Sequence, residues 1–333
     1  MVRINFTRKV IMENNNIIDI PSLQWYPGHM RKAERLVKEN LKFVDVVVEL
    51  LDARIPMSSA NPVLREIVNE KPRLIVLNKA DLADETATRA WVKYFAAEGL
   101  TAVPVDAVKG RGVKELVQAI AKCAKPKTDK LVHHGAKARA ARCMILGIPN
   151  VGKSSLINRL SGGSKTKVEN RPGVTRAKQW IRLGAQLELL DMPGILWPKF
   201  EDQHAALHMA FTGAINDNVY DVASVVLLLL DTLRTAYPSD LMERYRLEGV
   251  LPSGAALLEE IGRKRGCLRA GGKINYEKAE QIVLTDFRSG RLGRVTLDVL
   301  PSIPATENVY GKGNSENDDK RDREYLSAWQ CDR

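Results

Sequence analysis

Residues 142–155 read Arg-Cys-Met-Ile-Leu-Gly-Ile-Pro-Asn-Val-Gly-Lys-Ser-Ser, an apolar strand that runs into a glycine-framed loop and then into a helix beginning near Lys153. The spacing G-x-x-x-x-G-K-[ST] of a P-loop is met by Gly147, Gly152, Lys153 and Ser154. In a P-loop, successive backbone N–H groups surround a polyphosphate, and glycine leaves room for it because it has no Cβ. A chance glycine loop is the alternative, and the strand before the loop and the apolar helix face after it argue against it.

The composition is that of a globular protein with a sizeable core. The chain has 333 residues, of which 44% are hydrophobic and 27% charged, enough for two domains. Its formal net charge is +11. Such a charge predicts an anionic partner larger than a nucleotide, and nucleic acid is the first candidate.

Cysteine spacing and hydropathy exclude several other classes of protein. The four cysteines are scattered, without a C-x-x-C pair, so we expect reduced thiols in a cytoplasmic protein and no zinc site. The longest apolar run, 225–230, is far too short to span a membrane. The polar start of the chain carries no signal-peptide core, so we expect no membrane insertion.

A second expected strand, 73–77, delivers the sequence Asn78-Lys-Ala-Asp81 at its carboxyl end, where ligands bind in open α/β sheets. N-K-x-D is the pattern that reads guanine. The Asp81 carboxylate can accept hydrogen bonds from the ring N–H and the exocyclic amine of guanine, which adenine cannot supply. Asn78 would fix the base edge and the loop, and the Lys79 stem can lie along the ring. A polar strand end without a ligand is the alternative, which the P-loop in the same chain weakens.

A third expected strand, 102–105, ends at Asp106-Ala-Val-Lys109. In GTPases a Ser-Ala-Lys turn at this point supports the base through the backbone N–H of its alanine. Ala107 fits that role, although Asp106 replaces the usual serine. Because the contact comes from the backbone, the turn is still expected to line the base.

Two helices, 85–98 and 113–124, are expected around this strand. The segment 125–141 that follows is rich in lysine, arginine and alanine and includes His133 and His134. Neither histidine has a carboxylate or cysteine nearby in the sequence. We therefore interpret the segment as a solvated basic connector rather than as a metal site.

Two further motifs follow the P-loop. The basic loop at 171–176 offers Thr175 as a ligand for Mg²⁺ when a γ-phosphate is present. A strand at 187–190 closes on Asp191-Met-Pro-Gly194, in which Asp191 would hold Mg²⁺ through water and the Gly194 N–H would contact the γ-phosphate. Together with a lysine that reaches the β- and γ-phosphates and a serine that holds Mg²⁺ in the P-loop, these motifs predict a GTPase.

The order of the motifs differs from that of Ras-like GTPases, because the base-reading motifs precede the phosphate-reading ones. The fold can be unchanged if the segment 125–141 joins the old termini and new ones open between the Asp191 loop and an apolar strand at 43–51, buried on both faces. The expected class is α/β. It comprises a circularly permuted P-loop GTPase domain, with a mostly parallel sheet flanked by helices, followed by a smaller all-helical domain.

These motifs, in this order, resemble the circularly permuted GTPases of the YlqF type, also called RbgA. The resemblance covers about residues 24–297 and rests also on Gln24-Trp-Tyr-Pro-Gly-His-Met30, Asp52-Ala-Arg-Ile-Pro56 with Asn61-Pro62, and Gly290-Arg-Leu-Gly-Arg294. It implies GTP hydrolysis stimulated by the maturing large ribosomal subunit. It also implies contacts with rRNA and ribosomal proteins.

The resemblance points to a role for two further residues, His29 and Asn150. Ile195 stands where Ras-like enzymes have the glutamine that orients water, so either a side chain from elsewhere in the chain or the ribosome must position the water. The resemblance points to His29, and a His29 that only packs its turn is the alternative. Asn150 resembles the asparagine that supports K⁺ in cation-dependent GTPases, although asparagine also suits a tight loop.

The expected nucleotide site combines all of these positions. Its GTP- or GDP-binding residues are Asn78, Lys79, Asp81, Asp106, Ala107, Asn150, Val151, Gly152, Lys153, Ser154, Ser155 and Gly194. Its catalytic residues are His29, Lys153, Thr175 and Gly194. Mg²⁺ would be held by Ser154, Thr175 and Asp191, and K⁺ by Asn150.

Helices are also expected at both ends of the chain. One after the Trp25 turn carries an apolar stripe at Ala33, Leu36, Val37 and Leu41. Later helices are expected at 204–215, 223–237, 255–264 and 276–289. Between residues 262 and 294 there are nine Lys or Arg and three Asp or Glu, which predicts a footprint for a phosphate backbone; a solvated face is the alternative.

The expected domains are an N-terminal extension at 1–22, a GTPase domain at 23–203, a helical RNA- or ribosome-binding domain at 204–298 and a disordered tail at 299–333. The leading functional hypothesis is a cytoplasmic, monomeric GTPase whose nucleotide state sets its affinity for a precursor of the large ribosomal subunit. A regulatory switch acting on a protein partner without RNA is one alternative. An assembly factor that binds GTP without hydrolysing it is the other.

Overall fold

The structure is a computed structural model, which describes residues 8–13, 16–21, 28–68, 71–135, 139–162, 180–183, 187–190 and 202–301. The chain divides into two compact units, 1–298 and 299–333. All helices and strands reported below belong to the first unit. The tail expected to be disordered lies outside the described residues from 302 onward.

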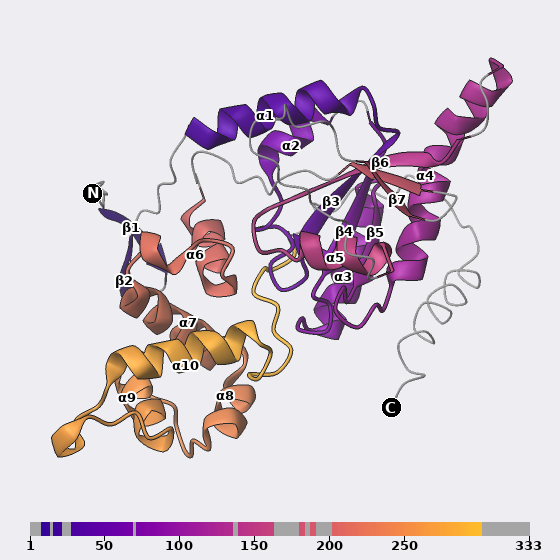
Figure 1. Cartoon of the computed structure of the whole chain (residues 1–333). Coiled ribbons are helices and arrows are strands. Elements are labelled where there is room, and N and C mark those ends of the chain that lie inside the picture. Colours follow the sequence, from indigo (N-terminus) through magenta and orange to yellow (C-terminus); the bar gives the residue numbers. More distant parts are fainter. Residues whose placement is uncertain are drawn as a thin grey trace, which may run out of the picture. The chain divides into compact units, whose positions relative to one another are not determined.

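A six-stranded sheet is the centre of the region that carries the nucleotide motifs (Figure 1). Its strands are β3 (Val46–Asp52), β4 (Arg73–Asn78), β5 (Thr101–Val105), β6 (Ala141–Gly147), β7 (Trp180–Leu183) and β8 (Leu187–Leu190). They lie in the order β5-β4-β3-β6-β8-β7 and are parallel, except that β7 pairs antiparallel with β8. The carboxyl ends of β3, β4, β5 and β6 therefore meet at one edge.

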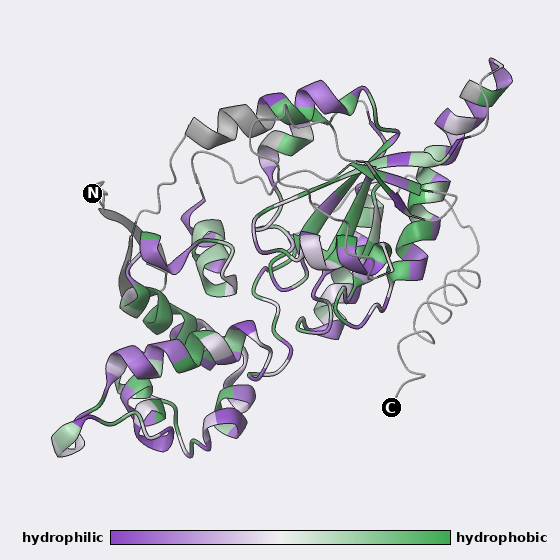
Figure 2. Cartoon of the chain, viewed as in Figure 1, coloured by the Kyte–Doolittle hydropathy of each residue, from purple (hydrophilic) through white to green (hydrophobic). Residues whose placement is uncertain are grey.

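The central strands are apolar on both faces because helices cover both faces. Every residue of β3 is buried, and its three consecutive valine side chains alternate between two hydrophobic clusters. Val46 and Val48 pack in the cluster that includes α4 (Val113–His133) and α5 (Lys153–Leu160), whereas Val47 packs with α1 (Gly28–Leu41) and α2 (Pro62–Ile67). Figure 2 shows the hydrophobic colour along these strands.

The register of the strands places the expected motifs side by side at the carboxyl edge of the sheet. Asp52 at the end of β3 pairs with Asn78 at the end of β4, and Asn78 pairs with Val105 at the end of β5. On the other side of β3, Leu50 pairs with Gly147, the first glycine of the P-loop. Each motif therefore begins where its strand ends, beside the motif of the next strand.

Helices make up most of the described chain after β8. They are α6 (Gln203–Thr212), α7 (Val222–Ala236), α8 (Pro238–Tyr245), α9 (Gly254–Lys264) and α10 (Tyr276–Arg288), with short 3-10 turns η1 (Asp217–Val219) and η2 (Ala270–Gly272). Their start points have local causes: the side chains of Asp202, Asp221 and Asn275 accept backbone N–H groups in the first turns of α6, α7 and α10. On α10, Ala279, Val283 and Phe287 are buried as its apolar stripe predicts, and Ile282 is partly buried.

The helix expected to end at 124 runs on through the first part of the segment 125–141, and most of the described residues of that segment are exposed, as its basic composition indicated. Helix α4 continues through Pro126 to His133. Proline removes one helical hydrogen bond, but tertiary contacts hold this part of the chain. The next residue, Lys127, lies 3.0 Å from the fully buried Asp45, and Arg139 binds the same carboxylate at 2.7 Å. A buried carboxylate thus anchors both ends of the segment.

Several other expectations needed correction. Leu36 was assigned to the core stripe of α1, but it is 37% exposed, and its neighbour Val37 is fully buried. Five short elements were not expected: α2, α8, β7, and the two strands of an antiparallel hairpin, β1 (Arg8–Glu13) and β2 (Asn16–Pro21). Each has eight residues or fewer, too short for a periodic pattern to stand out. Within the part of the chain that the structure describes, no helix could cross a membrane.

Candidate nucleotide site

The P-loop connects β6 to α5 in the geometry that phosphate binding requires. Gly152, at the start of α5, has φ +98°, a conformation that side-chain-bearing residues rarely adopt. A Cβ there would lie 2.3 Å from the Asn78 side-chain nitrogen, and a Cβ on Gly147 would lie 2.7 Å from the Leu50 carbonyl oxygen. Among the described residues no side chain caps the start of α5 at Gly152, so its backbone N–H groups can serve an anion.

The base-reading motif contacts the phosphate-reading motif directly. Asn78 Nδ2 donates to the Val151 carbonyl oxygen at 2.8 Å, and Lys79 Nζ donates to the Asn150 carbonyl oxygen at 2.8 Å. Lys79 itself has φ +58°, which turns the chain sharply at the end of β4. Motifs about 70 residues apart in the chain are therefore in direct contact.

Asp106 replaces the usual serine and closes the adjoining turn. Its Oδ1 accepts the Val108 and Lys109 N–H groups at 3.0 and 2.9 Å, and its Oδ2 has no hydrogen-bond partner among the described residues. Ala107 N–H points to Asn78 Oδ1 at 3.3 Å, a long bond that a guanine carbonyl could share. Burial, and then the Asp106 carboxylate, raise the pKa of Asp81 above its usual value.

Asp52 is a site residue that sequence reasoning did not assign to the nucleotide pocket. It is 2% exposed, receives the Arg54 guanidinium through two bonds of 2.8 and 2.9 Å, and lies 2.9 Å from Lys79 Nζ. Burial alone would raise the pKa of Asp52, but Arg54 and Lys79 outweigh burial and hold that pKa well below its usual range. Asp52 and the Asn150 carbonyl oxygen of the P-loop therefore hold the Lys79 ammonium group together.

The motif Gly290-Arg-Leu-Gly-Arg294 packs against the base-reading loop. Gly290 has φ +74°, and a Cβ there would lie 2.6 Å from the Leu82 side chain. Val295 N–H donates to the Leu82 carbonyl oxygen at 3.0 Å, and Arg294 pairs with Glu85 at 3.5 Å. The residues after α10 thus contact the chain immediately after Asp81.

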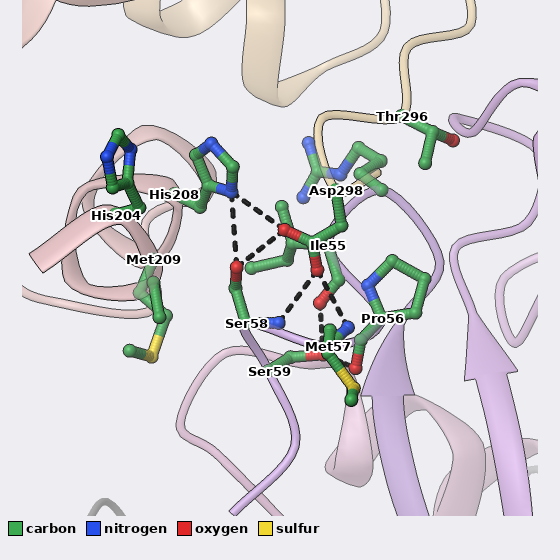
Figure 3. A network of polar contacts seen from close by, with 12 residues as sticks. Ile55, Pro56, Met57, Ser58, Ser59, His204, His208, Met209, Thr296 and Asp298 are labelled. Carbon is green, nitrogen blue, oxygen red and sulfur yellow. Dashed lines mark hydrogen bonds and ion pairs between the residues drawn. The ribbon is translucent and has the colours of Figure 1, made fainter. Parts of the chain in front are cut away.

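A buried polar network joins the same C-terminal segment to the loop after β3 (Figure 3). The N–H groups of Met57 and Ser58 each donate to Asp298 Oδ2 at 2.7 Å, and Ser58 Oγ donates to Asp298 Oδ1 at 2.5 Å. His208 Nδ1, from α6, lies 2.8 Å from the same Oδ1. In a catalytic triad the serine and the aspartate contact opposite nitrogens of the histidine ring. Here Ser58 and Asp298 both approach Nδ1 of His208, so the network holds two segments together and is not a catalytic triad.

Asn150, the expected K⁺ ligand, also contacts the helical region. It has φ +56°, and its Nδ2 donates to the Gly213 carbonyl oxygen at the end of α6 at 2.9 Å. The amide oxygen, which is the atom that would bind a cation, is on the other branch of the side chain. The contact links the P-loop to α6.

Not all of the basic residues between 262 and 294 are free to meet a phosphate backbone. Arg288 binds Asp217 through bonds of 2.7 and 2.9 Å and also donates to the carbonyl oxygens of Ala210 and Phe211. Its guanidinium therefore holds the end of α6. Lys264, Lys273 and Lys278 are exposed.

The magnesium site can be examined only in part. Thr175, Asp191 and Gly194 lie outside the described residues, and for His29 only the backbone, in the first turn of α1, is described. Ser154 and Ser155 are exposed at the start of α5. Within the described ranges no group of three or more His, Cys, Asp or Glu could hold a metal ion.

The sheet order, the P-loop after the central strand β6 and the N-K-x-D motif after β4 define a circularly permuted P-loop GTPase. A family model described as a 50S ribosome-binding GTPase matches residues 142–252. The chain is 49% identical over 276 residues to ribosome biogenesis GTPase A of Bacillus cereus, covering 83% of this chain and 93% of that one. The chain therefore belongs to the ribosome biogenesis GTPase A family and is a GTPase, an enzyme that hydrolyses GTP to GDP and phosphate.

More distant relatives and a solved structure support the same family assignment. A ribosome biogenesis GTPase A of Thermotoga maritima is 30% identical, covering 87% of this chain and all of that one. The mouse mitochondrial ribosome-associated GTPase 1 is 35% identical, covering 84% of this chain and 91% of that one. The GNP-bound structure of YlqF from T. maritima superposes with a TM-score of 0.56 at 27% identity, covering 80% of this chain and 97% of that one.

Proposed function

We propose that GTP binding and hydrolysis by this protein control its association with a maturing large ribosomal subunit, in the cytoplasm and as a monomer. The observation that carries the proposal is the seating of residues 290–298 on the base-reading loop and on the loop after β3. A change in the nucleotide pocket would strain these contacts and so bias the helical region. The relatives named for ribosome biogenesis support the choice of the ribosome as partner.

Each site residue has a proposed role in this cycle. Asp81 reads guanine, with Asn78, Lys79, Asp106 and Ala107 shaping its surroundings. Lys153 stabilises charge on the β- and γ-phosphates, and the loop residues Val151, Gly152 and Ser155 contribute backbone N–H groups. Ser154, Thr175 and Asp191 would hold Mg²⁺, and Gly194 would contact the γ-phosphate. Mg²⁺ supplies charge neutralisation between the phosphates when it is bound.

Two of the proposed roles concern the acceleration of hydrolysis. His29 would position the attacking water, because Ile195 cannot donate or accept a hydrogen bond through its side chain. Asn150 would support a K⁺ ion near the phosphates through its amide oxygen. The charge of such an ion would act where an arginine finger acts in other GTPases.

The partner is proposed to be rRNA together with ribosomal proteins. The net charge of +11 supports an anionic partner, and phosphate contacts would make the affinity fall steeply with salt. A protein partner without RNA need not show such a slope. A salt titration of binding therefore separates the two.

A multiple-turnover GTPase assay, with and without large ribosomal subunits and in K⁺ or Na⁺, tests the proposal. We expect subunits to stimulate turnover, more strongly in K⁺, and co-sedimentation with subunits to depend on a GTP analogue. Equal binding in all nucleotide states, without stimulation, would contradict it. Asp81→Asn should shift preference from GTP toward xanthosine triphosphate, and an unchanged preference for GTP would overturn the assignment of the base site.

A further inference from the structure

A pocket of about 810 Å³ lies in the helical region, where the carboxyl ends of α8 and α9 and the segment after α10 meet. This volume lies in the range of ligand pockets. Five basic side chains line it: Arg244, Arg246, Lys264, Arg265 and Arg291. They come from three separate stretches of the chain, so the fold, not one charged run, gathers them.

A single buried carboxylate organises three of these arginines. Asp286, on α10, is 2% exposed and receives Arg244 through bonds of 2.8 and 2.9 Å. Arg265 and Arg291 approach the same carboxylate at 3.6 and 3.5 Å. One negative charge cannot balance three positive ones, so Asp286 orients these guanidinium groups without neutralising them.

The orientation leaves the cations accessible. The side chains of Arg244 and Arg265 are 28% and 29% exposed and that of Arg291 is 60% exposed, and Arg246 and Lys264 are exposed at the rim. Arg265 stacks on the Tyr245 ring with 5.2 Å to the ring centroid, and its Nη2 donates to the Arg244 carbonyl oxygen. Stacking fixes the plane of the guanidinium before any ligand arrives.

The charge of the pocket is positive even when its acidic groups are included. Asp240 and Glu243 also line it, so with Asp286 three carboxylates stand against five cations. Basic residues at helix carboxyl ends stabilise the helix dipoles, which accounts for one or two of them at each end. Dipole stabilisation does not require them to share one cavity or one carboxylate.

We propose that this pocket binds the phosphate backbone of RNA and is the main RNA contact of the helical region. The planar forks of its arginines match phosphate oxygens, and its open face suits a chain of phosphates. The proposal deepens the function proposed above, on which it rests for the source of the RNA. The proposal assigns the RNA contact to only some of the basic residues in the stretch 262–294. Arg288 and Arg269 of the same stretch are instead paired with Asp217 and Glu277.

The test uses the full-length protein, a non-hydrolysable GTP analogue and rRNA extracted from bacterial large ribosomal subunits. Affinity is measured between about 50 and 300 mM KCl for the unmodified protein, for Arg246→Gln/Lys264→Gln, and for the control Lys273→Gln/Lys278→Gln. Both double variants remove two positive charges from exposed side chains of the same region, but the control pair does not line the pocket.

Affinity falls as salt rises, and we expect this fall to be less steep in the pocket variant. The magnitude of the slope of log affinity against log salt should decrease by roughly 1.4 on single-stranded and 1.8 on duplex RNA. The control should lower it by less than half as much. Circular dichroism and thermal unfolding check that each variant folds. If the double variant does not fold, Arg246→Gln alone should lower the slope by roughly 0.7 to 0.9.

The pocket would be ruled out as the RNA site if the salt dependence became shallower by the same amount in both double variants, or did not change in the pocket variant. Either result would leave the proposal of an rRNA partner standing. Failure of the unmodified protein to bind rRNA in any nucleotide state would overturn the pocket and the rRNA partner together. Titration of the protein with inorganic phosphate and with pyrophosphate tests whether the pocket binds a small phosphate compound rather than the RNA backbone. Micromolar binding of either one, abolished by the pocket variant and with RNA binding unchanged, would also overturn the proposal.

Discussion

Replacing Asp52 by asparagine probes the link between Lys79 of the N-K-x-D motif and the rest of the protein. The substitution keeps the size of the side chain but removes its charge. Arg54, which is 2% exposed, and Lys79, which is 21% exposed, then lose their shared counter-ion. Removing one partner of a buried ion pair costs about 3–5 kcal/mol, so we expect the free energy of unfolding to fall by about that much.

The pH dependence gives this prediction a second readout. The pKa of Asp52 is lower in the folded than in the unfolded protein, because Arg54 and Lys79 outweigh the effect of burial. Between those two pKa values the unfolded state binds more protons, so the stability from Asp52 is present above its unfolded pKa of about 3.9 and is lost as the pH falls toward the folded value. Asp52→Asn should therefore have a flatter stability profile below about pH 4 than the unmodified protein.

The assay is urea unfolding followed by circular dichroism at several pH values, with GTP affinity measured at neutral pH. Lys79 loses one of its two anchors, so we expect GTP to bind about tenfold more weakly, the equivalent of one charged hydrogen bond at the low end of its range. Asp129→Asn is the matched control, because Asp129 forms an exposed pair with Lys125; it should leave the free energy of unfolding nearly unchanged. A cost below about 1 kcal/mol for Asp52→Asn, with the acid profile and GTP affinity unchanged, would refute the reasoning.

Three further perturbations test other contacts. Gly152→Ala places a methyl group against Asn78 at φ +98° and should weaken nucleotide binding at least tenfold, measured by fluorescence of a labelled GDP; binding within a factor of two would contradict it. Asp298→Ala removes the acceptor of Met57, Ser58 and His208 and should lower the unfolding free energy by about 2–4 kcal/mol in thermal unfolding, whereas an unchanged melting temperature would show that the tie is not stabilising. Burial raises the pKa of the Cys143 thiol to about 12, so at pH 8 iodoacetamide should label it only after unfolding, as peptide mass mapping can show; equal labelling of the folded protein would be inconsistent with this burial.

Local patterns were enough to predict five of the six strands of the central sheet and the motifs that follow them. Strands such as Arg73–Asn78 are short apolar runs, and the loops that follow them carry residue types at fixed spacing. Both signals lie within about ten residues of chain. The α/β class, the permuted GTPase fold and the GTPase activity were therefore predicted correctly from the amino-acid sequence.

Other features depend on contacts between residues that are distant in the chain. Asp298 meets Met57 across 241 residues, and Asn150 meets Gly213 across 63. The continuation of α4 through Pro126 depends on Asp45, which lies more than 80 residues earlier. Local propensity predicts a break at such a proline, and tertiary contacts such as that of Lys127 with the buried Asp45 oppose that preference.

The amino-acid sequence thus determined which chemistry the chain can carry, because nucleotide-reading groups are specified by residue type and short spacing. The packed fold alone showed which of the basic residues are available. Arg288 and Arg291 lie three residues apart, yet Arg288 pairs with Asp217 at the end of α6 and Arg291 lines the open pocket. In the sequence both arginines carry the same positive charge. Their exposure and their ion pairs, which arise from contacts across the fold, show which of the two is available to a ligand.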